Sequence, residues 1–502
     1  MVLLIYPPVS KPSEPPPGIA KLSGSLNNHS IEYKVLDANL EGLFYLLKIL
    51  PDAEDAWTKR AFRNLSKNID SLKYRGICKN FDRYKRAVMD INRLIEMAGK
   101  KSDIFMTLSD YKDSHLSPVK SKDLIKAAEN PEINPFYTYF KVRFTELLEK
   151  HNISLIGFSL NYLSQALSTF AMIGFLKRFY PSIKLAIGGG LVTSWLRRPE
   201  GKNPFEGLID YLVDGPGEHK LLSIMGKKPV EDNYIPDYSL LPMKDYLAPD
   251  IILPYSTSTG CYWNKCSFCP ERAEKTPYKP IPADRVLWEL NTLINTLKPY
   301  LIHLLDNAIS PALLKEIIKN PLPVPWYGFT RIISHLTDIE FCMALKKSGC
   351  IMLKLGLESG SQNVLDYMQK GLSLEIASRV LKNLKKAGIS TYIYLLFGTP
   401  GETLLDANKT REFIIKHAEE INFLNLAIFN MPIYGPEAVE FKTSNFYDGD
   451  LSLYTDFVHP KNWDRKTVRK YLERDFKRQS VIAEILKKTP PFFTSNHAPF
   501  FV

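Results

Sequence analysis

The sequence predicts an α/β protein with a doubly wound, Rossmann-like N-terminal domain, a partial (β/α)6 barrel and a helical C-terminal extension. Two series of short apolar runs, one before residue 225 and one from residue 253, alternate with segments of helical periodicity. Gly- and Pro-rich turns follow many of the apolar runs. This alternation is typical of parallel strands joined by helices that cover the sheet. After about residue 432 the alternation fades.

The N-terminal series begins with the apolar run Val2–Tyr6, which a Pro-rich loop follows. From about residue 41 to 150 apolar residues recur at helical spacing, which predicts a mainly helical insertion. Strand signals resume at Leu155–Ser159, and a later strand runs into a glycine loop. We expect residues 1–225 to form one domain and residues 226–252, rich in Pro, Asp and Tyr, to form a linker.

The second series predicts six strands joined by helices, as in a partial barrel. We assign residues 253–432 to this barrel and residues 433–502 to the extension, in which 465–488 is expected to be one amphipathic helix. The predicted strands are 255–258, 302–306, 326–330, 352–357, 393–397 and 424–429.

Composition is that of an ordinary globular protein, with 45% hydrophobic and 24% charged residues in 502. No run of about 18 apolar residues occurs, so we expect no membrane span. The start of the chain lacks the pattern of a signal peptide, which favours a cytoplasmic protein. The net charge is +11. Because Lys and Arg lie thinly spread with acids nearby, we interpret this charge as a solvated surface and expect no nucleic-acid partner.

Three of the six cysteines, Cys261, Cys266 and Cys269, lie within nine residues with the spacing Cys-x4-Cys-x2-Cys. They follow a predicted strand, which places them in a loop at the carboxyl end of the barrel. Clustered cysteines without an export signal indicate a metal site in a reducing compartment rather than a disulfide framework. The scattered Cys78, Cys342 and Cys350 are interpreted as small buried hydrophobes.

Three kinds of metal site compete for this loop. Structural zinc sites usually take four ligands in two close pairs, and no second pair is present. A ferredoxin cluster needs a fourth cysteine, but Cys342 is distant and falls in a predicted helix. A four-iron cluster with three thiolates leaves one iron open for a substrate. The spacing favours this third hypothesis.

The cysteine segment resembles the signature of the radical S-adenosylmethionine (SAM) superfamily, in which an aromatic residue such as Phe268 precedes the last cysteine. The resemblance implies a [4Fe-4S] cluster on Cys261, Cys266 and Cys269, whose open iron binds SAM. It implies cleavage of SAM to a 5′-deoxyadenosyl radical. Gly260 before the first cysteine would give the loop room around the cluster.

Further positions match strands that contact SAM in that superfamily. Asp306 ends a predicted strand on the side of the SAM amino group, although the usual Gly-Gly-Glu is absent. Arg331 either faces the SAM carboxylate or makes a surface salt bridge. Glu358 and Ser359, in Leu-Glu-Ser-Gly, suit hydrogen bonds to ribose hydroxyls.

A later segment, Gly398-Thr-Pro-Gly-Glu402, matches a loop that packs near adenine in the superfamily. Gly398 is assigned to this part of the SAM site. For Glu402 we favour a capping role at the helix that starts near Leu404. No catalytic residue is assigned.

The N-terminal domain and linker resemble the cobalamin-binding region that precedes the barrel in one radical SAM class. The resemblance implies a corrinoid contacted by Pro17 and by Gly188, Gly189 and Gly190, since glycine lets backbone approach a ligand. The loop Asp-x-His-x-x-Gly, which supplies a cobalt-binding His in many cobalamin proteins, is absent. The domain therefore either binds cobalamin without a His ligand or is purely structural.

The implied activity is a cobalamin-dependent methyl transfer to an unactivated carbon or phosphorus. The first alternative is a radical SAM enzyme of other chemistry, such as cyclisation, rearrangement or oxidation. The second is an electron-transfer protein without catalysis. Expected partners are a small-molecule or peptide substrate and an electron donor such as a flavodoxin or ferredoxin. A C-terminal aromatic group is expected either to cover the barrel mouth or to pack on its base: Phe492, Phe493, His497, Phe500 and Phe501.

Overall fold

The computed structural model describes residues 1–49, 55–197, 203–445, 448–491 and 497–502. It contains two compact units. Unit 1 comprises Met1–Ile251, Asp448–Ser452 and, near the end of the chain, Pro491. Unit 2 comprises Ile252–Tyr447, Leu453–Pro490 and His497–Val502. The four segments predicted from the sequence remain our proposal for the domain organisation. Within the described residues, no helix is both long and apolar enough to cross a membrane.

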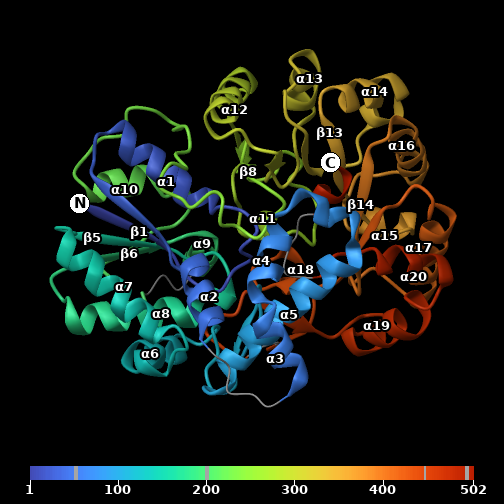
Figure 1. Cartoon of the computed structure of the whole chain (residues 1–502). Coiled ribbons are helices and arrows are strands. Elements are labelled where there is room, and N and C mark those ends of the chain that lie inside the picture. Colours follow the sequence, from blue (N-terminus) through green and yellow to red (C-terminus); the bar gives the residue numbers. More distant parts are fainter. Residues whose placement is uncertain (50–54, 198–202, 446–447, 492–496) are drawn as a thin grey trace. The chain divides into compact units, whose positions relative to one another are not determined.

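Unit 1 contains a parallel sheet in the order β2-β1-β5-β6-β7. Helices α1 and α10 lie on one face of the sheet and α7 and α8 on the other (Figure 1). Strand β2 pairs with one edge of β1, and β5, which comes later in the chain, pairs with the other edge. The direction in which strands are added therefore reverses between β1 and β5. The strands are β1 (Val2–Tyr6), β2 (Tyr33–Asp37), β5 (Leu155–Ser159), β6 (Lys184–Gly188) and β7 (Tyr211–Leu212), and the covering helices are α1 (Pro17–Asn28), α7 (Tyr137–Lys150), α8 (Leu163–Phe179) and α10 (Glu218–Ile224).

The segment between β2 and β5 is mainly helical and includes one short hairpin. Its helices bury apolar faces, as in α5, where Val88, Ile91 and Ile95 are fully buried. Besides α7, it contains α2 (Ala38–Lys48), α3 (Ala56–Arg63), α4 (Leu65–Lys73), α5 (Phe81–Lys100), the hairpin β3 (Ile104–Met106) and β4 (Tyr111–Asp113), and α6 (Ser121–Glu129).

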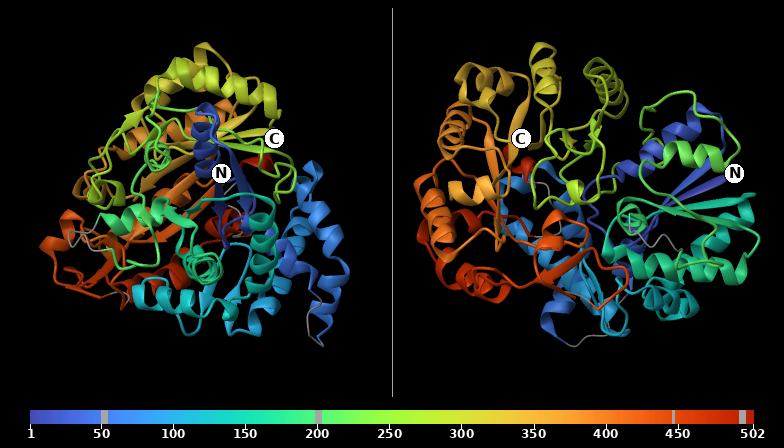
Figure 2. Two further views of the ribbon diagram at one scale, coloured as in Figure 1. Left: turned by 90° about the vertical axis from the view of Figure 1, so that its left-hand side faces the viewer. Right: turned by 180° about the vertical axis from the view of Figure 1, so that it is seen from behind.

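Unit 2 is built on six parallel strands in the order β15-β14-β13-β12-β11-β8, which is the sequential order of a partial barrel. The helices between the strands line the outside of the sheet (Figures 1 and 2). The strands are β8 (Ile252–Tyr255), β11 (Leu301–Leu304), β12 (Trp326–Thr330), β13 (Cys350–Glu358), β14 (Ser390–Phe397) and β15 (Phe423–Ile428), and the main helices are α12 (Ala283–Leu297), α13 (Pro311–Lys319), α14 (Ile339–Lys347), α16 (Leu374–Ala387) and α17 (Leu404–Lys416). The predicted α/β fold class is confirmed.

The end of the chain differs from the single helix predicted over 465–488. Helix α19 (Arg465–Tyr471) continues into a π turn (Leu472–Phe476), and α20 (Ser480–Lys487) follows a break. The wider turn brings Phe476 into the core, where its ring lies 5.3 Å from that of Phe397. Between Pro432 and α19, the described chain also contains the short helix α18 (Pro436–Glu440) and strands β17 (Thr443–Ser444) and β18 (Tyr454–Phe457).

The C-terminal aromatic residues that the structure describes pack on the base of the barrel. The ring of His497 lies 4.4 Å from that of Tyr392 and 4.7 Å from that of Phe423. Phe423 opens β15, so these contacts are at the end of the sheet opposite the carboxyl ends. Phe492 and Phe493 lie outside the described residues.

Candidate active site

The three clustered cysteines lie in the loop between β9 (Ser258–Thr259) and α11 (Pro270–Ala273), just after the first barrel strand. Gly260 takes a positive φ of 70°, and a Cβ there would approach the Pro277 carbonyl to 2.6 Å, so this turn requires glycine. Cys269 is the residue before α11, Cys266 is buried, and Cys261 is partly exposed. All three thiols are free.

The donor set of this loop fits a cluster held by three thiolates. Among the described residues, no three His, Cys, Asp or Glu side chains converge to hold a single metal ion. A cluster needs no such convergence, since each thiolate binds a different iron. Burial raises the pKa of the Cys269 thiol to about 11, so uptake of iron by the loop would release protons. The other two cysteines of the unit are used elsewhere, because Cys342 contacts the Leu336 carbonyl and Cys350 that of Met352.

A four-residue segment after α15 (Gln362–Tyr367), residues 368–371, holds the cysteine loop in place. The Met368 carbonyl accepts a hydrogen bond from the Ser267 amide at 3.0 Å. The Gln369 carbonyl accepts one from Trp263 Nε1 at 3.3 Å. Gly371 has a φ of 62°, and a Cβ there would collide with the Trp263 ring. The indole therefore packs directly on this backbone.

Arg331 lies one residue beyond the end of β12 and is buried against the cysteine loop. Its Nη1 lies 3.8 Å from Cys266 Sγ, its guanidinium lies 4.0 Å from the centre of the Trp263 ring, and it donates a hydrogen bond to the Lys370 carbonyl. The alternative of a surface salt bridge is therefore wrong. A buried cation beside a thiolate ligand would offset the negative charge of a cluster.

Glu358 ends β13 at a register shift and has a positive φ of 67°. Its Oε1 lies 2.7 Å from Lys370 Nζ, and both side chains are buried. Lys370 Nζ also lies 5.6 Å from the centre of the Phe268 ring in the cysteine loop. Within the described chain, Glu358 Oε2 has no protein hydrogen-bond partner. It can therefore accept hydrogen bonds from a ligand.

Asp306 anchors the start of the cysteine loop. The carboxylate accepts hydrogen bonds from Thr257 N at 3.1 Å, from Thr257 Oγ1 at 2.7 Å and from Ser258 Oγ at 2.5 Å. These three contacts explain the presence of an acid at the end of β11 without any ligand. A contact with the SAM amino group remains a proposal.

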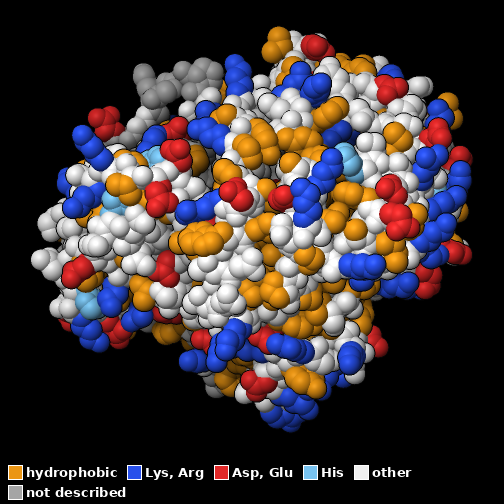
Figure 3. Space-filling model, turned by 90° about the horizontal axis from the view of Figure 1, so that it is seen from above, with side chains coloured by type: hydrophobic (Ala, Val, Ile, Leu, Met, Phe, Trp, Pro, Cys, Tyr) orange, Lys and Arg blue, Asp and Glu red, His pale blue; other side chains and the backbone are white. Residues whose placement is uncertain are grey.

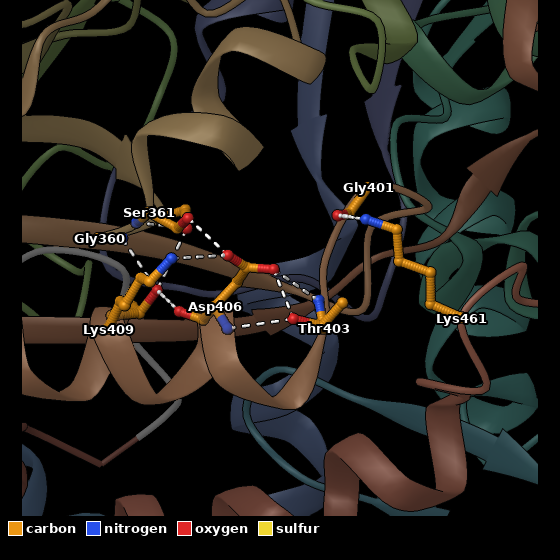
Figure 4. Close-up of polar contacts among 9 residues, drawn as sticks. Gly360, Ser361, Gly401, Thr403, Asp406, Lys409 and Lys461 are labelled. Atoms are coloured by element: carbon orange, nitrogen blue, oxygen red, sulfur yellow. Dashed lines mark hydrogen bonds and ion pairs between the residues drawn. The ribbon is translucent and has the colours of Figure 1, made fainter.

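Ser359 and its neighbours face α17. Ser359 Oγ lies 3.1 Å from Thr410 Oγ1 and accepts a hydrogen bond from the Ser361 amide. Ser361 Oγ in turn donates a hydrogen bond to Asp406 at 2.7 Å. Asp406 also accepts hydrogen bonds from the amide and the hydroxyl of Thr403 (Figure 4). These contacts of Ser359 hold the turn after β13, and a ribose contact of its side chain remains a proposal.

The loop after β14 begins at Gly398, which has a φ of 79° and donates its amide hydrogen to Glu402 Oε2 at 2.5 Å. Glu402 is not the helix cap that we favoured from the sequence. Thr403 caps α17, together with Asp406 in a capping box. Glu402 is instead fully buried, and Trp463 Nε1 donates to its Oε2 at 2.8 Å. The carboxylate points inward because two buried donors, rather than the helix end, bind it.

Segment 459–463 of the extension supports the same loop. Lys461 Nζ donates to the Gly401 carbonyl at 2.6 Å (Figure 4), and His459 contacts that of Thr399 at 2.9 Å. Burial raises the pKa of Glu402 to about 8, partly opposed by the Gly398 and Trp463 hydrogen bonds. The loop predicted to pack near adenine is therefore held by side chains that are remote in sequence.

In unit 1 the predicted cofactor positions lie at the carboxyl edge of the parallel sheet. A Cβ at Gly18, next to Pro17, would lie 3.6 Å from Ser159 Oγ, so the start of α1 meets the end of β5 at the reversal of strand order. Ligands of open α/β sheets bind at such a point. Gly189 has a φ of 110°, and its Cβ would collide with the Leu160 carbonyl, so the fold alone requires this glycine. In contrast, Gly190 is exposed and has free space for a Cβ.

Sequence reasoning missed two residues of the site, Lys370 and Trp263. Lys370 is a single lysine in a loop, and only folding places it against Glu358, 12 residues away. Trp263 lies within the cysteine motif and was therefore available to sequence reasoning. Its importance follows from its position between Arg331 and Gly371.

The fold and site together fit a domain that holds an iron–sulfur cluster and SAM at the carboxyl end of a partial barrel. Residues 255–414 match the Radical SAM superfamily. This part of the chain is thus a radical SAM domain, of the kind that uses a [4Fe-4S] cluster and SAM.

Solved structures of similar fold cover most of the chain. The radical SAM methyltransferase TsrM of Kitasatospora setae, solved with cobalamin and a [4Fe-4S] cluster, has a TM-score of 0.53 at 16% identity and covers 89% of this chain and 81% of its own. The cobalamin-dependent SAM radical enzyme OxsB has a TM-score of 0.56 at 12% identity and covers 94% of this chain and 66% of its own. At these identities the likeness shows a common fold.

Two curated relatives match part of the sequence. An uncharacterized methyltransferase of Pyrococcus horikoshii is 27% identical over 245 residues, which are 44% of this chain and 52% of the relative. The anaerobic magnesium-protoporphyrin IX monomethyl ester cyclase of Rubrivivax gelatinosus is 26% identical over 214 residues, 40% of this chain and 38% of the relative. The chain thus spans about half or less of the length of these relatives.

Proposed function

We propose that this radical SAM enzyme is a cobalamin-dependent methyltransferase that acts on an unactivated carbon or phosphorus. The main support is the two-part architecture. A three-thiol loop at the carboxyl end of a barrel shares the chain with a doubly wound sheet whose carboxyl edge has an exposed glycine. A similar fold extends over most of two enzymes, of which one was solved with cobalamin bound and the other is named cobalamin-dependent.

Cys261, Cys266 and Cys269 would hold the cluster, which with SAM supplies a 5′-deoxyadenosyl radical when bound. Burial raises the pKa of the Cys266 thiol, and the positive charges of Lys370 and Arg331 beside it partly oppose this rise. Glu358 offers its second carboxylate oxygen to a ribose hydroxyl while Lys370 orients the first. Asp306, Ser359 and Gly398 shape the surrounding turns. The buried Trp463–Glu402 contact keeps the last of these turns in place.

Cobalamin would lie at the carboxyl edge of the unit 1 sheet, near Pro17, Gly188, Gly189 and Gly190. Gly190 is exposed, and a Cβ there meets only Asn161 Oδ1 at 3.8 Å, so a side chain can be added at this position without a clash at Cβ. We therefore expect Gly190→Phe to fold normally and to lose corrinoid binding. Ser223→Phe, on an exposed part of α10, is the matched control and should bind corrinoid like the wild type.

The deciding experiment uses protein reconstituted anaerobically with iron and sulfide, and supplied with SAM, a reductant and methylcobalamin. Formation of 5′-deoxyadenosine tests the radical step, and retention of corrinoid on gel filtration tests the second cofactor. Release of 5′-deoxyadenosine without retained corrinoid would contradict the cobalamin part alone. A flavodoxin or ferredoxin is the proposed physiological donor, and the cytoplasm the proposed compartment.

A second candidate function is radical chemistry of another type, such as cyclisation. It is favoured by the 26% identity to a protein named as a cyclase. The mass of the product distinguishes the two functions, since methyl transfer adds one methylene to the substrate and cyclisation adds no carbon.

A further inference from the structure

The helices α3, α4 and α5 of unit 1, with their connections, have a strongly positive net charge. From Ala56 to Lys100 there are twelve Lys and Arg against four Asp and Glu, a net charge of +8 out of the total of +11. The expectation of thinly spread charge therefore does not hold for this segment. Over most of the face drawn in Figure 3, in contrast, Lys and Arg lie among Asp and Glu.

Internal ion pairs neutralise only part of this charge. Arg60 pairs with the buried Asp90 at 3.1 Å, Lys73 with Asp245 at 3.2 Å, and Arg75 with Asp250. Arg93 is shared between Asp55 and Glu96. The remaining basic residues of the three helices and their connections have no carboxylate partner within the described chain: Lys59, Arg63, Lys67, Lys79, Arg83, Lys85, Arg86 and Lys100.

A groove of about 360 Å³ lies among the basic side chains of α3 and α5. Arg60, Lys85 and Arg86 line it together with the ring of Trp57 and the thioether of Met89. Asp82 and Asp90 also line it. Asp90 is occupied, since it accepts hydrogen bonds from Trp57 Nε1 at 2.8 Å and from Arg60. The groove thus combines cations with an aromatic wall.

Two aromatic side chains of this segment are exposed: Trp57 by 39% and Tyr74 by 66%. The Arg93 guanidinium lies 5.2 Å from the centre of the Trp57 ring, which holds this ring in place. Apolar residues of the helices, such as Ala61, Leu72 and Ile91, are buried. The surface therefore lacks the aliphatic stripe with which a membrane-bound helix enters lipid.

From these observations we propose that α3, α4 and α5 form a docking surface, the α3–α5 surface, for single-stranded nucleic acid. The phosphates of a nucleic-acid strand form a row of negative charges, which matches an extended array of cations better than a single small anion would. Guanidinium groups also bind phosphate in bidentate fashion. Exposed rings between the cations give unpaired bases a surface for stacking. This binding is independent of the proposed SAM chemistry.

The test measures binding of the full-length protein to a fluorescent RNA of about 20 nucleotides, to DNA of the same sequence and to the duplex. We expect both single strands to bind, and the affinity to fall steeply with salt. Reversal of four unpaired charges, in Lys59→Glu/Arg63→Glu/Lys85→Glu/Arg86→Glu, should weaken binding at least tenfold. It should also reduce the slope of log affinity against log salt concentration by up to about 3.

The matched control reverses four exposed lysines elsewhere in unit 1, in Lys141→Glu/Lys150→Glu/Lys227→Glu/Lys228→Glu. It has the same net charge and should bind within about threefold of the wild type, which separates this site from overall charge. Tyr74→Ala should weaken binding to single strands about tenfold, whereas Tyr74→Phe keeps the stacking ring and should not.

Several outcomes would overturn the proposal: no binding, equal losses in the two charge-reversed proteins, or a preference for the duplex. Polyglutamate and vesicles of phosphatidylserine with phosphatidylcholine are the competing probes. Should either bind as tightly as the single strands and lose binding in the same variant, the partner is an acidic protein or a lipid surface. Formation of 5′-deoxyadenosine is measured separately, so failure of either proposal can be recognised by itself.

Discussion

Lys370 Nζ lies 2.7 Å from Glu358 Oε1, with both side chains buried. The same lysine accepts a hydrogen bond from Arg331 through its backbone carbonyl. One residue thus connects the acid at the end of β13 with the cation beside Cys266. The orientation of Glu358 and Arg331 therefore depends on the loop that contains Lys370, although this loop supplies no ligand of the proposed cluster.

Replacement of Lys370 by Met should leave the Glu358 carboxylate buried and unpaired. We expect a loss of about 3–5 kcal/mol in the free energy of unfolding, together with weaker SAM binding by at least tenfold. Lys370→Arg should retain most SAM affinity. Chemical denaturation and SAM titration of the reconstituted protein measure the two effects.

The exposed Lys382→Met on α16 is the control and should match the wild type. The double variant Glu358→Gln/Lys370→Met should be more stable than Lys370→Met alone, because it removes the unpaired charge. Equal stability of these two variants would contradict the importance of the ion pair.

Each of Cys261→Ala, Cys266→Ala and Cys269→Ala should lose most of the iron retained after reconstitution. The physical reason is that three thiolates are the complete protein ligand set of the proposed cluster. Cys78→Ala removes a cysteine of unit 1 and should keep about four irons per chain. Iron analysis and the visible absorbance of the cluster check this, and a normal iron content in any of the three variants would exclude that ligand.

Stability should fall between about pH 5 and pH 8 because of Glu402. Burial raises its pKa from 4.5 to about 8, so in this window the folded chain binds more protons than the unfolded chain. Stability then decreases with rising pH, at up to about 1.4 kcal/mol per pH unit. Glu402→Gln keeps an acceptor for Trp463 and should lack this decrease.

The measurement is denaturation of both proteins at pH 5 and pH 8.5, after each has been shown to unfold reversibly. The difference in stability should favour Glu402→Gln at the higher pH and nearly vanish at the lower. Glu375→Gln, at an exposed position, controls for a general charge effect. A pH-independent difference would show that Glu402 is ionised in the folded protein across this range.

Asp406→Ala should destabilise the barrel by about 2 kcal/mol, because Asp406 is the third residue of α17, completes the capping box with Thr403 and also binds Ser361 (Figure 4). Loss of the Ser361 contact should also loosen the turn after Glu358 and weaken SAM binding. Asp366→Ala removes an exposed carboxylate that accepts one side-chain hydrogen bond and should have little effect. Thermal denaturation and SAM titration compare the two, and equal behaviour would contradict this role of Asp406.

The fold class could be predicted because strand and helix periodicities are local. The strands β5 and β12 have the predicted bounds. The break within 465–488 could not be predicted, since the π turn depends on burial of Phe476 against Phe397. The prediction that Glu402 caps a helix was wrong for a similar reason, because Trp463, which binds its carboxylate, lies 61 residues away.

By itself, the sequence determined the three thiols, their spacing and the absence of a fourth cysteine nearby, because spacing within one loop survives without knowledge of the fold. It also contained the charge of residues 56–100, which an average over the chain concealed. Only the tertiary structure decided which groups face those thiols. Arg331 and Lys370 reach the cysteine loop because parallel strands bring their carboxyl ends to one edge. Contacts between side chains that meet at this edge from distant parts of the chain leave no pattern in the local sequence.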